Sequence, residues 1–197
     1  MWYSQDAWLV AKKSEVNRER IINAANKLFY EKGFNQTAFS EVAEASGIPK
    51  GNFYYYFKSK DELLDAVIAM REKSIQSLLE NWEVEYTNPH DRLKRYVKIL
   101  INEASEVVQY GCPLGTLNSE LAKSQRNLQS RAHSMFELFN HWLIRQFRAL
   151  GKGRESAHLA MHLLSMTQGA ALIANIYRDK PFISREVKRI NDWIDSL

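Results

Sequence analysis

Cysteine, glycine and proline are scarce in this chain of 197 residues. The single cysteine, Cys112, excludes an internal disulfide and is typical of a protein of the reducing cytoplasm. Eight glycines and four prolines are too few for a loop-rich or all-β protein. No run of 18 apolar residues is present, and the first residues lack the basic and apolar segments of a signal peptide. We therefore expect a cytoplasmic protein without a membrane partner.

Motifs that carry enzymatic or metal chemistry are missing as well. The chain has no glycine-rich phosphate loop, no nucleophile elbow and no pair of carboxylates at a spacing typical of an active site. Cys112 could serve as a nucleophile, but no base for it is identifiable. His158 and His162 are four residues apart and could share a metal, but no third ligand is evident. We therefore predict a protein that is not an enzyme and that needs no cofactor or metal.

Positive charge is present but unevenly distributed. The formal net charge is +4, which is too mild to prove a nucleic-acid partner. The first 60 residues hold nine basic and six acidic side chains, whereas the remainder holds 18 and 17. A phosphate-binding module would benefit from an excess at this end. A DNA-packaging protein should be more basic, and a membrane-surface protein needs a strongly basic amphipathic helix, which is absent.

Apolar residues recur at helical spacing along nearly the whole chain, which predicts an all-α protein. We expect Thr37 to cap a short second helix that Gly47 ends, and Ser59 to open a long fourth helix with a capping box. The other expected helices span about 16–32, 49–56, 91–108, 116–122, 126–150, 157–177 and a last stretch after Ser184.

The two short helices and the turn between them match a helix-turn-helix, whose second helix enters the major groove of DNA. Residues 47–60 hold three lysines and no acid. Phe53 and Phe57 are four residues apart and fit the core, but Tyr54, Tyr55 and Tyr56 cannot all be buried on so short a helix. Asparagine pairs with adenine and lysine with guanine, while tyrosine hydroxyls donate to phosphates. The pattern predicts binding to double-stranded DNA.

Residues 17–65 closely resemble the TetR/AcrR family of transcriptional regulators. The resemblance rests on the run Arg20–Ala25, on Leu28-Phe29 and Lys32-Gly33-Phe34, on Ala45–Ile48 and on the continuous run Lys50–Leu64. It implies that the first three helices bind operator DNA. By position, it assigns DNA contacts to Thr37, Lys50, Gly51, Asn52, Tyr54, Tyr55 and Lys60. The chain departs from the family at Tyr55 or Tyr56, where histidine is usual.

The resemblance divides the chain into an N-terminal extension (1–15), a helix-turn-helix domain (16–60) and an effector-binding and dimerisation domain (61–197). It implies that the last two helices pair with those of a second copy. The segment 157–177 agrees independently, because it is apolar on nearly all sides and carries small residues that suit close packing. A central helix within one chain is the alternative. Two recognition helices of a homodimer would meet half-sites about 34–36 Å apart, which predicts an inverted-repeat operator.

A small-molecule effector is expected to bind among the middle helices. Methionine and aromatic side chains at helical spacing also fit an ordinary core. The candidate lining residues are Tyr110, Cys112, Met135, Phe139, Trp142, His162 and Met166.

Cys112 is the sharpest of these candidates, because the segment from Gly111 to Leu121 resembles the NemR-type, electrophile-sensing branch of the family. A helix N-terminus favours a reactive thiolate, whereas a small buried apolar residue is the alternative reading of Cys112. We expect a repressor that a small molecule releases from DNA, either an electrophile or oxidant acting at Cys112 or a non-reactive hydrophobic ligand or drug. A non-specific DNA-binding protein is the third alternative.

Overall fold

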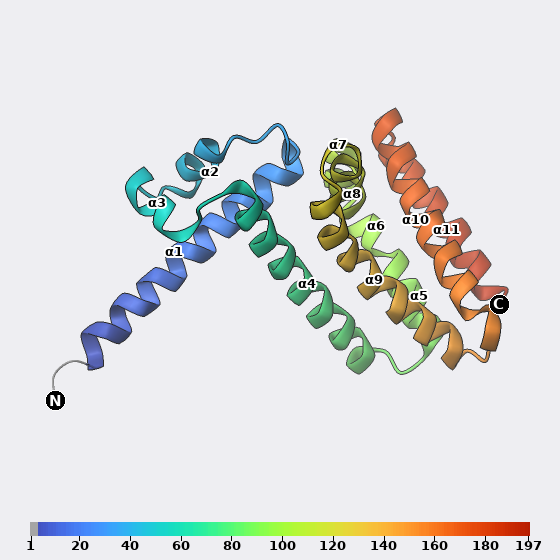
Figure 1. Cartoon of the computed structure of the whole chain (residues 1–197). Coiled ribbons are helices and arrows are strands. Elements are labelled where there is room, and N and C mark those ends of the chain that lie inside the picture. Colours follow the sequence, from blue (N-terminus) through green and yellow to red (C-terminus); the bar gives the residue numbers. More distant parts are fainter. Residues whose placement is uncertain (1–3) are drawn as a thin grey trace. The chain divides into compact units, whose positions relative to one another are not determined.

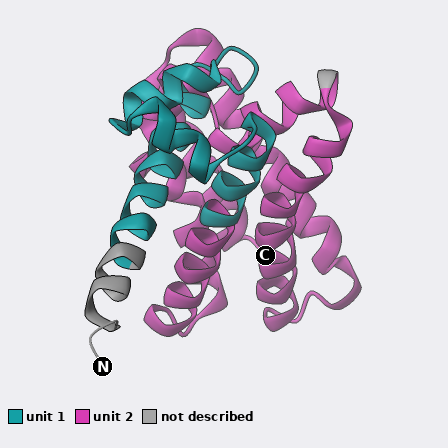
Figure 2. Cartoon of the chain, turned by 60° about the vertical axis from the view of Figure 1, so that its left-hand side comes forward, with its two compact units in different colours: residues 1–70 teal, residues 71–197 magenta. Residues whose placement is uncertain are grey.

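The computed structural model describes the backbone of residues 4–197, and the side chains of residues 12–123 and 125–197. Part of the expected N-terminal extension therefore lies outside the described residues. Two compact units divide the chain, residues 1–70 and residues 71–197 (Figure 2). The division falls within one long helix.

Eleven α-helices and one 3-10 turn make up the regular structure of the described residues, so the all-α prediction is confirmed (Figure 1). The helices are α1 (Ser4–Glu31), α2 (Phe39–Ser46), α3 (Lys50–Tyr56), α4 (Lys60–Glu85), α5 (Pro89–Val97), α6 (Ile99–Asn102), α7 (Ala104–Tyr110), α8 (Pro113–Ser124), α9 (Arg126–Ala149), α10 (Ser156–Tyr177) and α11 (Lys180–Asp195), with the 3-10 turn η1 at Gly153–Glu155.

The first unit packs α1, α2, α3 and the start of α4 around a small apolar core. The residues of this core are Ile21, Ile22, Ala25, Phe29, Phe34, Val42, Ala43, Ile48, Phe53, Phe57, Leu63, Leu64 and Val67. Gly47 ends α2 in the left-handed region, with φ of +65°, which glycine adopts without strain. The guanidinium of Arg20 donates to the carbonyl of Ser46 beside it, so α1 holds the turn that follows α2.

The start of α2 differs from the expectation, because Thr37 does not cap it. The N-cap is Ala38, whose backbone N–H donates to the carboxylate of Glu41 at 2.7 Å. The hydroxyl of Thr37 instead donates to the carbonyls of Gly33 and Leu28, at 2.7 and 3.3 Å. The carbonyl of Leu28 also accepts from the N–H of Lys32 at 2.9 Å, so the Thr37 hydroxyl folds back onto the end of α1 and is not available to cap α2.

Two further helix boundaries differ from the expectation. α1 begins at Ser4 rather than near residue 16. The single helix expected over 91–108 is three helices, interrupted at Lys98 and Glu103. At the first interruption the N–H of Ile101 donates to the carbonyl of Lys98, which is the tighter i→i+3 pattern. The β-branched residues Ile99 and Ile101 there favour a helix less than leucine or alanine would.

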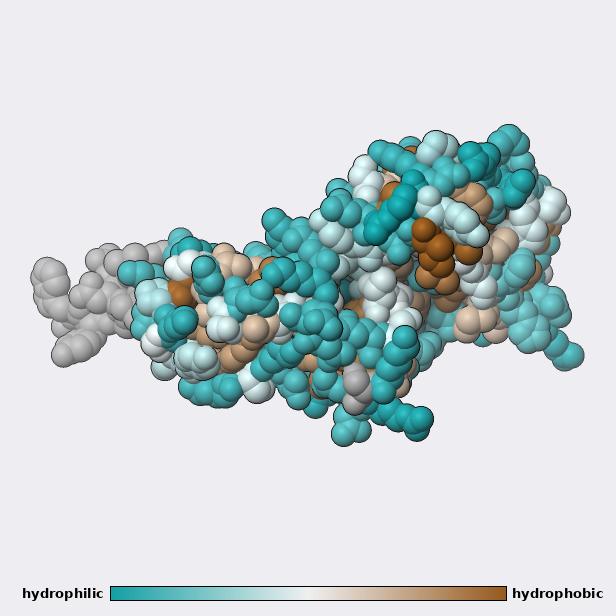
Figure 3. All heavy atoms as spheres, turned by 90° about the horizontal axis from the view of Figure 1, so that it is seen from above, coloured by the Kyte–Doolittle hydropathy of each residue, from teal (hydrophilic) through white to brown (hydrophobic). Residues whose placement is uncertain are grey.

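The second unit is a bundle in which α10 packs against α7, α9 and α11, while α9 also packs against α5 and α8. α10 was expected to be buried on all sides, and within one chain it is not. Leu172, Ile176 and Tyr177 are 57, 60 and 74 % exposed, whereas Leu163 and Ala171 on its other side are fully buried. Hydrophobic atoms are also visible among the mostly hydrophilic surface in Figure 3.

The segment Gly153–Tyr177, which contains α10, has the length and apolar composition of a membrane-spanning helix. In the folded protein 39 % of its most apolar stretch is buried. The core helix of a soluble protein meets the same criterion. Its packing against three neighbouring helices fits that description better than a membrane span.

Candidate nucleic-acid interface

α3 is fixed by one face and leaves the other to solvent. Phe53 and Phe57 are fully buried, and each contributes about 1.5–3 kcal/mol by its burial. The edge of the Phe39 ring lies against Phe53, with ring centroids 4.9 Å apart, which joins α2 to α3. Pro49 precedes the helix, and its carbonyl accepts the first two N–H bonds, from Asn52 and Phe53. The helix therefore presents its polar residues in a fixed orientation.

The exposed face of α3 carries Lys50, Gly51 and Asn52 in its first turn. Nothing lies within 4 Å of the position that a β-carbon on Gly51 would take, so the backbone there borders open space. No acidic side chain occurs between Gly47 and Lys60. This end of the helix therefore offers amide and ammonium donors, the groups that recognise base edges in the major groove.

The three tyrosines of α3 have different surroundings, as expected from the length of the helix. Tyr55 is 75 % exposed and Tyr54 is 47 % exposed. Tyr56 is half-buried, and its hydroxyl accepts a hydrogen bond from the amide of Asn17 in α1 at 3.3 Å. Lys58 donates to the backbone carbonyl of Tyr54 and lies 5.9 Å from the centre of the Tyr55 ring. Two tyrosines are thus available to a ligand, and the third joins α3 to α1.

Lys60 and Thr37 hold the loop between α1 and α2, and the structure does not present their polar atoms on the face of α3. The ammonium of Lys60 donates to the carbonyls of Phe34 and Thr37, at 3.0 and 3.1 Å, and lies 4.5 Å from the centre of the Phe34 ring. Thr37 is 1 % exposed, and its hydroxyl bonds to carbonyls. We therefore leave both residues out of the proposed DNA contacts.

Two acidic side chains near this surface, Glu41 and Glu62, are bound to backbone and lysine partners. Hydrogen bonds from Lys32 and from the N–H of Ala38 lower the pKa of Glu41 below its ordinary value. Glu62, the second acid after α3, accepts from the backbone N–H of Lys58 at 2.8 Å, and its own N–H donates to the hydroxyl of Ser59. One half of the capping box expected at Ser59 is therefore present, in the bond from the N–H of Glu62 to the Ser59 hydroxyl, whereas the Glu62 carboxylate accepts from Lys58 rather than from Ser59.

The seven expected effector residues fall in different places. Met135, Phe139 and Trp142 of α9 are buried core residues. Tyr110 and Cys112 are half-buried where α7 ends and α8 begins, and the sulfur of Cys112 accepts from the N–H of Gly115 at 3.4 Å.

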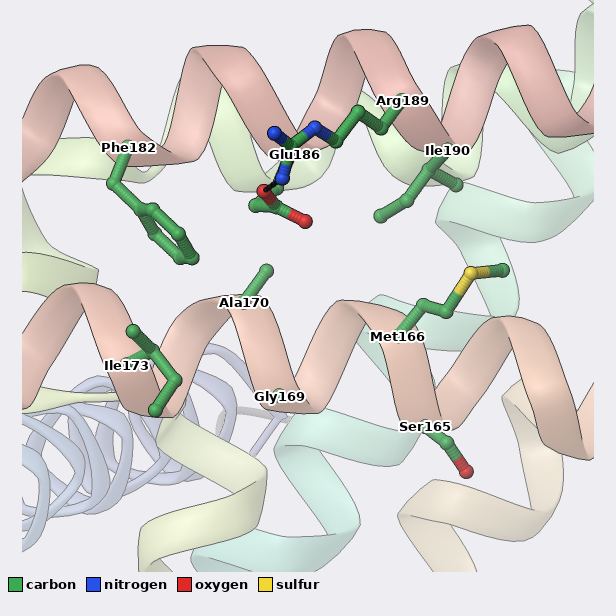
Figure 4. A pocket seen from close by; sticks show the side chains of 9 residues that line it. All are labelled: Ser165, Met166, Gly169, Ala170, Ile173, Phe182, Glu186, Arg189 and Ile190. Carbon is green, nitrogen blue, oxygen red and sulfur yellow. Dashed lines mark hydrogen bonds and ion pairs between the residues drawn. The ribbon is translucent and has the colours of Figure 1, made fainter.

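His162 and Met166 lie apart from these residues. His162 is exposed, with its ring 5.1 Å from that of Trp193 in α11. Met166 lines a groove of about 300 Å³ between α10 and α11 (Figure 4). The predicted set does not form one site.

The same groove contains a charged pair on an otherwise largely apolar wall. Arg189 donates to Glu186 at 2.7 Å, both on α11 (Figure 4). The facing side is α10, with Met166, Gly169, Ala170 and Ile173. Small residues at Gly169 and Ala170 leave room for another helix to approach closely.

Residues that the sequence did not single out also lie in the interior of the second unit. Burial raises the pKa of Tyr96 far above its ordinary value, and its hydroxyl lies 3.1 Å from that of Thr167. The Tyr96 ring packs against Phe139, with centroids 5.5 Å apart. The helical spacing of Leu93, Tyr96 and Val97 was the available signal, since all three share the buried face of α5.

Comparison with known proteins agrees with this architecture. Residues 21–67 match the model for bacterial regulatory proteins of the tetR family, and residues 89–186 match that of the LmrA/YxaF-like transcriptional regulator C-terminal domain. The HTH-type transcriptional regulator LmrA of Bacillus subtilis (strain 168) is 28 % identical over 163 residues, covering 80 % of this chain and 86 % of LmrA.

Solved structures of similar proteins share the fold over nearly the whole chain. A TetR transcriptional regulator from Legionella pneumophila has a TM-score of 0.78 and 25 % identity, covering 90 % of this chain and 95 % of its own. The reduced form of E. coli NemR has a TM-score of 0.75 at 22 % identity, covering 89 % and 96 %, a likeness of fold alone. With a helix-turn-helix in the first unit and an all-helical second unit, the chain belongs to the TetR family of bacterial transcriptional regulators.

Proposed function

We propose that this TetR-family regulator is a cytoplasmic repressor that binds an inverted-repeat operator as a homodimer and leaves it when a small molecule binds. The observation that carries the proposal is the exposed, acid-free face of α3, held by Phe53 and Phe57. Lys50 and Asn52 contact base edges, Gly51 allows the backbone to approach, and phosphate contacts come from Tyr54 and Tyr55.

The exposed apolar face of α10 and the groove beside α11 support the homodimer. Leu172 and Ile176 would each lose contact with water if a second copy covered them, and this burial favours association. Because a twofold axis places the same surface of each copy in contact, α10 and α11 meet their own counterparts. The dimer then offers two copies of α3 to two half-sites.

Regulation by an effector requires a difference in affinity between two conformations. A ligand that binds more tightly to the conformation with badly spaced recognition helices lowers DNA affinity by that difference. The protein does not need chemistry of its own for this, in keeping with a family of regulators rather than enzymes.

DNase footprinting on the DNA upstream of the chain's own gene and its neighbours tests the proposal. We expect a protected inverted repeat, with half-site centres about one helical turn apart or a multiple of it. Affinity should fall with salt yet remain at least about a thousandfold above that for unrelated DNA. Equal affinity for all sequences would favour the non-specific DNA-binding protein, and protection of one asymmetric half-site would contradict the dimer.

Cys112 supports one version of the release step, in which the effector is an electrophile. Its sulfur lies at the N-terminus of α8, receives the N–H of Gly115 and is half-buried rather than enclosed. Addition to para-benzoquinone forms one sulfur–carbon bond at the expense of a ring C=C bond. The thiol proton moves to one quinone oxygen and the proton of the attacked ring carbon moves to the other, which leaves a hydroquinone attached to the sulfur. The step needs no other oxidant. Gln168 of α10 lies close to Gly115, because its Oε1 is 2.6 Å from the position that a β-carbon on Gly115 would take, so an added ring on this side would displace it.

A Cys112→Ser protein is expected to keep operator binding after brief exposure to para-benzoquinone, whereas the wild-type protein loses it. Serine keeps an acceptor for the N–H of Gly115 but is not alkylated under these conditions. Fluorescence anisotropy with labelled operator, before and after treatment, measures the effect, and mass spectrometry confirms a single adduct. Equal release of both proteins would favour the non-reactive hydrophobic ligand instead.

A further inference from the structure

Two buried N–H donors in the second unit lack a hydrogen-bond acceptor. They are Nη1 of Arg95 in α5 and Nε1 of Trp142 in α9, and both are inaccessible to solvent and without a partner among the described residues. Trp142 is 1 % exposed as a whole. Buried donors in folded proteins almost always have an acceptor, so a pair without one requires an explanation.

These donors belong to one cationic and aromatic cluster, which Trp82 of α4 joins. The guanidinium carbon of Arg95 is 5.0 Å from the centre of the Trp82 ring. The rings of Trp82 and Trp142 meet edge to face, with centroids 5.7 Å apart. α5 packs directly against α9, the helix that carries Trp142. The Arg95–Trp142 donor pair thus lies among large aromatic surfaces in the interior of the second unit.

Arg92 and Gln146 nearby have hydrogen-bond partners, which sets Arg95 apart from them. Arg92 is three residues earlier on α5 and donates to the carbonyls of Tyr86 and Glu83 and to the amide oxygen of Gln146, at 2.7, 3.0 and 3.2 Å. Gln146 in turn donates to the carbonyl of Trp142 at 3.4 Å. Arg92 is therefore a structural residue.

No carboxylate among the described side chains offsets the charge of Arg95. The carboxylate of Glu83 accepts from Arg145 and Gln146, at 3.4 and 3.5 Å. No described carboxylate forms an ion pair with Arg95 within 4.0 Å. A guanidinium nitrogen that is buried without a counter-charge is costly, and an anionic ligand would remove this cost.

We propose that the Arg95–Trp142 donor pair binds the anionic group of the effector, and that the effector is an aryl carboxylate. One carboxylate has two acceptor oxygens and one negative charge, which matches one cationic and one neutral N–H donor. The indole rings of Trp82 and Trp142 provide surfaces for an aromatic body. The charge of Arg95 disfavours a cationic drug at this place. The inference rests on the proposed function, because it names the ligand class that releases the regulator.

Binding of benzoate and cinnamate to the full-length protein without DNA tests the inference, with benzamide and cinnamamide as uncharged counterparts. Isothermal titration and tryptophan fluorescence report the affinity. We expect the wild-type protein to prefer the carboxylates, and Arg95→Met to lose on the order of 10- to 100-fold in affinity for them but not for the amides. Trp142→Phe keeps an aromatic ring without the donor and should weaken carboxylate binding by a smaller factor. Arg145→Gln removes an exposed charge at the end of α9 and serves as the matched control with unchanged binding.

The thermal midpoint of the ligand-free variants separates binding from structure. Arg95 is half-buried as a residue, and removing its guanidinium, whose buried Nη1 has no acceptor, should leave the midpoint of Arg95→Met unchanged or raise it. A lowered midpoint, equal affinity of Arg95→Met for the carboxylates, or no carboxylate binding to the wild-type protein would each overturn the inference. Operator binding of the wild-type protein is measured separately. Its absence beside selective carboxylate binding would refute the proposed repressor and leave the anion site intact.

Discussion

Glutamate at both Leu172 and Ile176 is expected to make the protein monomeric and to abolish operator binding at concentrations where the wild-type protein is saturated. The two side chains are 57 and 60 % exposed within one chain, and a dimer would cover four of them. Covering this remaining apolar surface contributes about 3.5–7 kcal/mol in all, so its loss weakens the dimer roughly 300-fold or more. Four carboxylates in a desolvated interface add repulsion to this loss.

Sedimentation equilibrium measures the subunit association, and fluorescence anisotropy measures operator binding of the same samples. Val84→Glu is the matched control, because Val84 of α4 is 85 % exposed and lies outside α10 and α11. It should change neither quantity. Circular dichroism establishes that each variant is folded. If the protein with both Leu172→Glu and Ile176→Glu remains a dimer, the subunits associate through a surface other than α10.

An Asn52→Ala protein is expected to lose operator affinity. It should also lose its sequence preference at one base-pair position in each half-site. A direct base contact contributes about 1–3 kcal/mol, and a dimer makes it twice, so the loss is about 2–6 kcal/mol. Stability should not change, because Asn52 is exposed on α3 and no core residue depends on its side chain. The expected result is therefore a folded dimer with a relaxed recognition pattern.

Competition with operators carrying each single base-pair change measures this preference. Asn127→Ala, which removes an exposed asparagine on α9, is the control for the substitution itself. The slope of affinity against salt should be the same in both variants, because an asparagine amide displaces no counterion from phosphate. Equal loss of affinity for all sequences would show that Asn52 contacts the DNA backbone instead.

The first unit was largely predictable because the relevant signals are local. Gly47 ends α2 where a left-handed residue is needed, and Phe53 and Phe57 lie four residues apart on the buried face of α3. These patterns act within one or two helical turns, so the sequence alone predicts which face of the helix is exposed.

Lys60 and Thr37 show where this reasoning fails. From the sequence, a lysine and a threonine that flank a DNA-binding helix are expected to contact the phosphates of DNA. Lys60 instead donates to carbonyls of the loop between α1 and α2, 23 and 26 residues away in the chain, and Thr37 donates to carbonyls of that loop and of the last turn of α1. The geometry of that loop exists only once α4 packs on it, and no local pattern encodes it.

The interior of the second unit was predictable as apolar, but its chemistry was not. Met135, Phe139 and Trp142 are buried as helical spacing indicates. The separation of His162 and Met166 from them, and the missing acceptors of Arg95 and Trp142, follow from packing between helices distant in sequence. Spacing places residues on a helix face, whereas the presence or absence of a partner depends on the neighbouring helix.

If α10 forms the interface of the proposed homodimer, its uncovered face also makes the regulator sensitive to its own abundance. If only paired chains carry two recognition helices, the amount of active protein at low expression rises with the square of the chain concentration. A tight interface removes this dependence. With a weak interface, repression would fall steeply when cell division dilutes the protein. The apolar area around Leu172, Ile176 and Tyr177 thereby decides how few copies can keep an operator closed.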